Sequence, residues 1–125
     1  MEQAVRNFRV VGSPGFPLDE DEIRQRAGLA YDRSYDPKGM MRQAISVIAS
    51  GDRTPRLRSI KVPTLVIHGD SDKMCDVSGG RAIAAAVKGS ELVIIEGMGH
   101  NLPRPLWPRL ISLIVDHVQR AEVNP

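Results

Sequence analysis

Several features common in proteins are scarce in this chain of 125 residues, and each scarcity narrows its class. Its single cysteine, Cys75, excludes an internal disulfide framework and fits a reducing compartment best. No apolar run approaches the length that spans a membrane, and the N-terminus lacks the basic-then-apolar order of a signal peptide. We therefore predict a cytoplasmic chain without a membrane span.

Charge of one sign is not concentrated anywhere, because the 17 basic and 15 acidic residues are interspersed. The densest basic stretch, residues 53–61, has no aromatic side chain beside it on which a base could stack. We interpret it as a solvated linker, and we predict no nucleic-acid partner. The length and the hydrophobic content of 42% suit one soluble domain with a single core.

Residues 1–60 have the spacing of short helices and turns, apart from a weak strand candidate at residues 8–11. Asp19 is predicted to cap a helix that runs to about Asp32, with Glu22 completing a capping box. A second helix is predicted to begin at Asp36-Pro37, because proline suits the first helical position, and to stop at Gly51. These helices and a connector make up a first predicted unit.

After Pro63 the pattern changes to strand, helix, strand and helix, which makes residues 61–125 a second predicted unit. Both predicted strands are near-continuous apolar runs, as is typical of parallel strands buried on both faces. This alternation predicts an α/β fold with a parallel pair of strands. The expected elements are a strand at 64–68, a helix from Ser78 or Gly79 to Val87, a strand at 91–95 and a final helix at 106–120.

Residues capable of catalysis follow both predicted strands. Asp70 and Asp72 come after the first strand, and His100 comes after the second, between glycines that permit a tight turn. In open α/β sheets, ligands bind outside the carboxyl ends of the strands, so these side chains are expected to meet there. An acid followed by a histidine is the back half of a nucleophile–His–acid triad, although each residue alone could be a turn or surface residue.

The sequence Pro-Thr-Leu-Val-Ile-His-Gly-Asp-Ser-Asp at residues 63–72, followed by Gly-Met-Gly-His at residues 97–100, resembles the C-terminal half of an α/β-hydrolase in the esterase and lipase-like branch. The resemblance implies a βαβα part of the parallel sheet, preceded in residues 1–60 by the end of a small helical cap. It places the triad acid at Asp72 and the histidine at His100. Family members often have prolines after the acid, whereas this chain has Lys-Met-Cys-Asp, so Asp70 stays an alternative acid that the spacing favours less.

The nucleophile of that family stands in Gly-x-Ser-x-Gly, and this sequence contains no such motif. The nearest imitation is Val-Gly-Ser-Pro-Gly at residues 11–15, where Pro14 has no N–H to donate to an oxyanion. We interpret Ser13 as a turn residue. The prediction is therefore a C-terminal hydrolase portion that supplies acid and histidine for carboxylic ester hydrolysis and is inactive without the missing nucleophile half.

Two other interpretations of these residues have less support in the sequence. His68, Asp70 and Asp72 alternate like metal ligands, but no second histidine cluster accompanies them, and we predict neither a metal nor a cofactor. Met98 could line an acyl pocket, yet methionines are more often core residues.

The expected partners are a small-molecule ester or acyl substrate of the complete enzyme, and either the missing N-terminal half or a second copy at the exposed sheet edge. A non-catalytic interaction module that retains a partial hydrolase fold is the second hypothesis.

Overall fold

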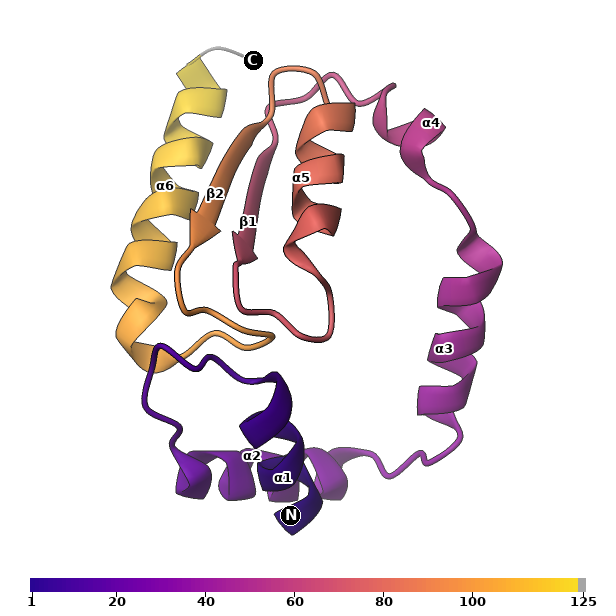
Figure 1. The fold of residues 1–125 in the computed structure, drawn as a ribbon, viewed down its shortest axis with the longest axis vertical. Helices are drawn as coiled ribbons and strands as arrows, with labels where there is room; N and C mark the ends of the chain where they lie inside the picture. Colours follow the sequence, from indigo (N-terminus) through magenta and orange to yellow (C-terminus); the bar gives the residue numbers. More distant parts are fainter. Residues whose placement is uncertain (124–125) are drawn as a thin grey trace.

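The computed structural model describes residues 1–123, and Figure 1 shows a two-stranded sheet between two helices, with further helices arranged below and beside it. The strands are β1 (Leu65–Gly69) and β2 (Glu91–Ile95), and the helices beside them are α5 (Val77–Ala86) and α6 (Trp107–Val123). The preceding helices are α1 (Glu2–Val11), α2 (Glu20–Arg33), α3 (Gly39–Ser50) and α4 (Thr54–Leu57), and a short 3-10 turn, η1 (Arg104–Leu106), leads into α6.

The two strands pair in parallel, from Leu65 opposite Glu91 to Gly69 opposite Ile95. The helix α5 connects them, so the predicted βαβα order of an α/β fold is confirmed. The second strand has the predicted bounds, whereas the first begins and ends one residue later than predicted. Helix α5 begins at Val77 because the Asp76 side chain caps it and accepts a hydrogen bond from the Ser78 N–H at 2.9 Å.

The predicted strand at residues 8–11 is wrong, because these residues form the last turn of α1. Val5, which is 1% exposed, together with Phe8 and Val11 places apolar side chains three residues apart on one helical face. Residues 8–11 alone span little more than one helical turn, so they do not reveal that period.

The other two N-terminal helices lie close to their predicted positions. Asp19 caps α2 and accepts a hydrogen bond from the Glu22 N–H at 2.8 Å, as predicted. Helix α3 begins at Gly39, because Asp36 accepts a hydrogen bond from the Gly39 N–H at 3.0 Å and places Pro37 in a turn before the helix. Gly51, with a φ of 58°, ends α3 as predicted.

The core lies where β2 meets the last helix. Ile95, Met98, Leu106 and Leu110 form a buried cluster, against which Phe16, Ile67 and Val93 pack. Met98 is therefore a core residue, with 5% of its surface exposed. This cluster fixes the segment that follows β2, since that segment contributes Met98 itself.

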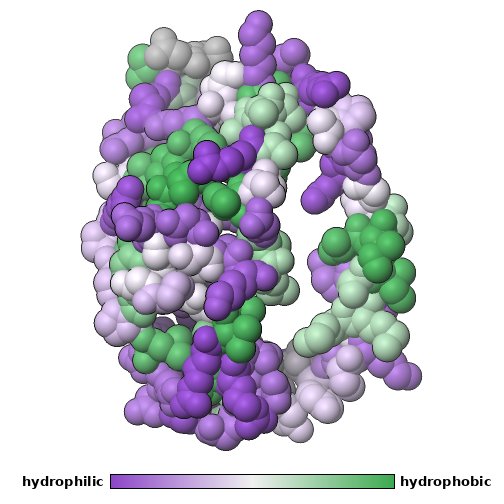
Figure 2. Space-filling model, in the orientation of Figure 1, coloured by the Kyte–Doolittle hydropathy of each residue, from purple (hydrophilic) through white to green (hydrophobic). Residues whose placement is uncertain are grey.

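Much apolar surface stays exposed. Figure 2 shows hydrophobic side chains gathered over α3, where Met40 and Ile48 are 82% and 81% exposed. Helix α6 exposes a stripe of four aliphatic side chains, Ile111, Ile114, Val115 and Val118. Within residues 1–123, no helix is both long and apolar enough to cross a bilayer.

Two glycines give a matched test of the packing between the strand ends. A Cβ on Gly69 would lie 2.0 Å from the Met98 carbonyl oxygen, whereas a Cβ on Gly79 would meet no atom within 4 Å. We expect Gly69→Ala to lower the free energy of unfolding by roughly 1–3 kcal/mol or more, because backbone must move. Gly79→Ala is expected to raise it by up to about 1 kcal/mol, since Gly79 is helical. Urea denaturation of the two variants measures both, and equal effects would contradict the close approach at Gly69.

Candidate active site

The loop after β1 folds around the carboxylate of Asp72. One oxygen, Oδ1, accepts hydrogen bonds from the Met74 and Cys75 N–H groups, each at 2.8 Å. Only 8% of the Asp72 side chain is exposed. An aspartate that accepts backbone N–H groups two and three residues ahead makes a local turn, so this sequence orients its own acid.

The loop after β2 carries His100 to the same end of the sheet. Gly97 adopts a φ of 69°, a conformation that favours glycine. Gly99 has no space for a side chain, because a Cβ there would lie 2.1 Å from the carbonyl oxygen of Gly12. These two glycines turn the chain sharply and let it pass close to the segment that follows α1.

Asp72 and His100 are in direct contact. The second carboxylate oxygen of Asp72, Oδ2, lies 2.8 Å from Nδ1 of His100, whose side chain is 40% exposed. A carboxylate at this position favours the tautomer with the proton on Nδ1. Within residues 1–123, Nε2 of His100 has no hydrogen-bond partner, so that nitrogen can exchange a proton with a group brought to it.

Two opposing effects set the pKa of Asp72. Burial raises the pKa, whereas hydrogen bonds from the Cys75 N–H, from His100 and from the Met74 N–H lower it. The hydrogen bonds prevail, and the pKa lies below the ordinary value of 3.8. Asp72 is therefore a carboxylate at neutral pH, which is the form that can stabilise a protonated imidazole.

The alternative acid, Asp70, has a different partner. Its Oδ1 accepts hydrogen bonds from the Gly97 N–H and from the Ser71 hydroxyl, both at 2.8 Å. Asp70 thereby joins the loop after β1 to the backbone of the loop that carries His100. Asp70 therefore binds the backbone of the histidine loop at Gly97, while Asp72 contacts the imidazole of His100.

His68 is held by contacts with the loop after β1 and with α5. Its Nε2 lies 2.8 Å from the Cys75 carbonyl oxygen and 4.0 Å from Oδ2 of Asp72. Gly80 of α5 packs on its ring, because a Cβ there would lie 2.7 Å from Nδ1. Across residues 1–123, no three His, Cys, Asp or Glu side chains converge as a metal site would require.

Ser13 is the residue whose role sequence reasoning missed. It begins a turn, as predicted, since its carbonyl accepts a hydrogen bond from the Phe16 N–H at 3.2 Å. Its side chain is also buried, and its Oγ accepts a hydrogen bond from the Gly99 N–H at 2.9 Å. A contact across 86 positions leaves no local signal in the sequence.

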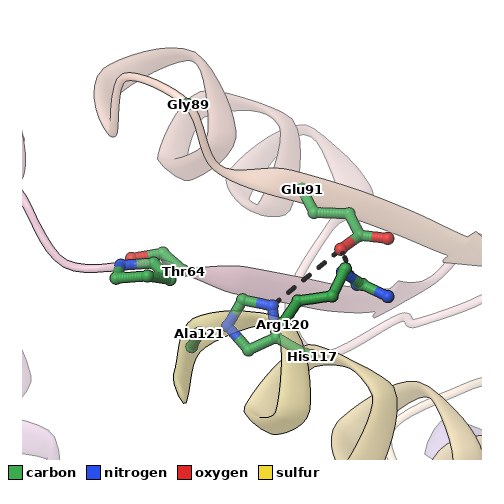
Figure 3. A pocket seen from close by; sticks show the side chains of 7 residues that line it. Thr64, Gly89, Glu91, His117, Arg120 and Ala121 are labelled. Atoms are coloured by element: carbon green, nitrogen blue, oxygen red, sulfur yellow. Dashed lines mark hydrogen bonds and ion pairs between the residues drawn. The ribbon is translucent and has the colours of Figure 1, made fainter. Parts of the chain in front are cut away.

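A pocket of about 230 Å³ lies at the opposite end of the strands, against the last turns of α6 (Figure 3). There Arg120 donates a hydrogen bond to Glu91 at 2.6 Å, and Nδ1 of His117 lies 3.9 Å from the same oxygen. Thr64, the residue before β1, and Glu91, the first residue of β2, line this pocket. The ion pair between Arg120 and Glu91 links α6 to the start of β2, at the end of the strand opposite to Asp72 and His100.

The family model described as serine aminopeptidase, S33, matches residues 4–104 of this chain. The match covers most of the chain and includes both Asp72 and His100. The chain belongs to this family of α/β-hydrolases, and its two parallel strands with their helices are a partial α/β-hydrolase fold.

Individual relatives include esterases and lipases. A rhodomycin D methylesterase of Streptomyces peucetius is 28% identical over 98% of this chain, and one of Streptomyces sp. (strain C5) is 30% identical over the same share. The chain spans 41% of the length of each. A monoacylglycerol lipase of Mus musculus is 37% identical over 46% of the chain, which corresponds to 17% of the lipase.

The depressed pKa of Asp72 predicts how stability depends on pH. Because the folded pKa lies below the unfolded value of 3.8, the carboxylate stabilises the fold fully above that value, and this stabilisation is lost as the pH falls through the folded pKa. We expect the free energy of unfolding to fall less steeply in Asp72→Asn than in the parent between about pH 5 and pH 2. Urea denaturation across that range measures both slopes, and parallel curves would contradict the assignment.

Proposed function

We propose that this chain supplies the acid and the histidine of a serine hydrolase triad, with Asp72 as the acid and His100 as the general base. The hydrogen bond of 2.8 Å between Nδ1 of His100 and Oδ2 of Asp72 is the observation that supports this proposal most. Membership of the α/β-hydrolase family supports it independently, since the family uses such triads.

In this proposal Asp72 holds the imidazole of His100 with its proton on Nδ1. Nε2 then accepts the proton of a serine hydroxyl as that oxygen attacks the substrate carbonyl, and the imidazolium is stabilised by the Asp72 carboxylate. The same nitrogen returns the proton to the leaving group, and water repeats the cycle on the acyl-enzyme. The low pKa of Asp72 suits this role, because the acid must stay ionised while His100 is charged.

The nucleophile in this proposal comes from polypeptide outside the 125 residues, because the sequence has no Gly-x-Ser-x-Gly. Ser13 does not serve, since its hydroxyl donates to Oδ1 of Asn101 at 2.6 Å and accepts from the Gly99 N–H. The oxyanion donors would come from the same outside polypeptide, because one of them is the residue that follows the nucleophile.

Carboxylic esters are the substrate class that we propose. The names of the relatives, methylesterase and monoacylglycerol lipase, denote ester hydrolysis, whereas the family model carries a peptidase description. We favour esters because both methylesterases align along nearly the whole of this chain. The acid–histidine pair itself suits acyl transfer from either substrate.

The activity test uses the protein read from the complete coding sequence around this chain, assayed with p-nitrophenyl esters and a fluorophosphonate probe. We expect esterase activity and labelling there, and neither in residues 1–125 alone. Asp72→Asn is expected to lower kcat on the order of 10⁴-fold, because the carboxylate no longer sets the tautomer. His100→Ala should abolish labelling.

Two matched variants make this test specific. Asp70→Asn keeps an oxygen that can accept the Gly97 N–H, so its effect on kcat should be far smaller than that of Asp72→Asn. His117→Ala removes a histidine at the far end of the strands and controls for general destabilisation. A complete protein without a Gly-x-Ser-x-Gly motif, or an active Asp72→Asn variant, would overturn the proposal.

A non-catalytic interaction module is the second candidate function, and the exposed apolar stripe of α6 favours it. Ile111 and Ile114 are 59% and 51% exposed, and aliphatic surface of this extent is usually covered by another surface. In either function, we propose that a further hydrolase segment or a second copy of the chain covers this surface and the sheet edge.

We expect residues 1–125 to self-associate as concentration rises, because burial of this stripe removes apolar surface from water. Sedimentation velocity measures the effect. Ile111→Lys should weaken association, whereas Gln119→Lys adds the same charge at an exposed polar position of α6 and should not. A monodisperse parent chain at all concentrations would contradict the expectation. Association that persists in Asp72→Asn, with no esterase activity in the complete protein, would favour the interaction module.

A further inference from the structure

Residues 11–13, at and just after the end of α1, form hydrogen bonds with three consecutive residues of the histidine loop. The Gly99 N–H donates to Oγ of Ser13 at 2.9 Å, and the His100 N–H donates to the Val11 carbonyl oxygen at 2.7 Å. The Ser13 hydroxyl donates to Oδ1 of Asn101 at 2.6 Å. One short segment therefore fixes His100 itself and the residues on both sides of it.

The hydroxyl of Ser13 donates one hydrogen bond and accepts another. Its proton goes to Asn101, because a carbonyl oxygen can only accept, and a lone pair remains for the Gly99 N–H. Ser13 is 8% exposed and its contact with the Gly99 N–H is buried, so water cannot readily replace that hydrogen bond. Two hydrogen bonds that meet at one buried oxygen leave the loop little freedom to shift.

The backbones around Ser13 approach so closely that the hydroxyl position is well defined. The Gly15 N–H donates to the Gly97 carbonyl oxygen at 3.0 Å, and the ideal Cβ position of Gly15 lies 2.8 Å from Cα of Gly97. These neighbouring contacts join backbone atoms and involve Gly15 and Gly97, so a substitution at Ser13 leaves them in place. The Ser13 hydroxyl is the contact here that a substitution can remove while the close approach is preserved.

We propose that Ser13 is a positioning residue that fixes the orientation of the His100 imidazole toward Asp72. The proposal rests on the proposed function only in taking Asp72 and His100 as the catalytic pair. Without the hydroxyl, the Gly99 N–H and the Asn101 side chain lose a buried partner, and the loop can rotate His100 away from Asp72. The imidazole then loses the carboxylate that favours the proton on Nδ1.

The tautomer of His100 reports this orientation directly. We would label the histidines of the full 125-residue chain with ¹⁵N and measure the two ring-nitrogen shifts at a pH where imidazole is neutral, with His100→Gln to assign the signals. The parent is expected to hold the proton mainly on Nδ1. Ser13→Ala should lower the ratio of Nδ1-protonated to Nε2-protonated imidazole by about tenfold, the scale of one lost buried hydrogen bond.

Matched variants separate positioning from stability. Ser90→Ala removes a half-buried serine hydroxyl that donates to the Ala84 carbonyl oxygen. Ser90 precedes the start of β2, whereas His100 follows its end, so this variant should leave the tautomer ratio unchanged. Asn101→Ala removes the acceptor of the Ser13 hydroxyl and serves as the test if Ser13→Ala does not fold. A lower Tm in folded Ser13→Ala or Asn101→Ala, with the parent tautomer ratio retained, would overturn the positioning role.

Asp72→Ala distinguishes failure of this proposal from failure of the proposed function. It should shift the His100 proton to Nε2 in the parent background. If Asp72→Ala leaves the tautomer unchanged, the acid–histidine pair and the function built on it fail. If Asp72→Ala has the expected effect and Ser13→Ala has none, only the role of Ser13 fails.

Discussion

The parallel pairing of β1 with β2 is the constraint on which the rest of the site depends. Because Gly69 lies opposite Ile95, the two loops leave the sheet side by side and in the same direction. Their backbones are then so close that Gly69 has no room for a Cβ beside Met98. This proximity brings one acidic loop and one histidine loop within hydrogen-bond distance. The chemistry of the pair follows from the register of the strands.

The strand pairing alone would still leave the histidine loop free on its other side. The end of α1 closes that side through contacts from residues 11–15, while Asp70 holds the Gly97 N–H from the sheet side. His100 is therefore held between an acid from the sheet and a backbone from a helical segment. The site draws on both parts of the chain, although the two side chains that meet in it come from one.

Prediction from the sequence worked where the signals were local. The apolar run at Glu91–Ile95 gave the second strand with its observed bounds, and Asp19 marked the start of α2. It failed at residues 8–11, where a short apolar run resembles a strand but ends a helix, and at Pro37, where a turn precedes the helix. Local spacing predicts the ends of elements poorly, because caps and turns compete for the same residue types.

The candidate site also combines residues that local signals predict with contacts that they do not. Two successive parallel strands predict that Asp72 and His100 meet at one end of the sheet, and the structure shows the contact between them. The sequence left Asp70 as an alternative acid because both aspartates occupy one turn, and only their different partners distinguish them. The hydrogen bonds of Ser13 could not be predicted from the sequence, since no periodicity links residues 13 and 99. Pairings of this kind depend on how whole elements dock.

Helix α3 has no buried residue, and this bears on the conformation of the chain between α2 and α4 in solution. A helix of 12 residues is marginal in water unless packing supports it, and the apolar side of α3 faces outward, with Met41 68% exposed. Methionine side chains adapt readily to surfaces of different shape. The helical content of this segment in solution is therefore expected to depend on the surface that lies against α3.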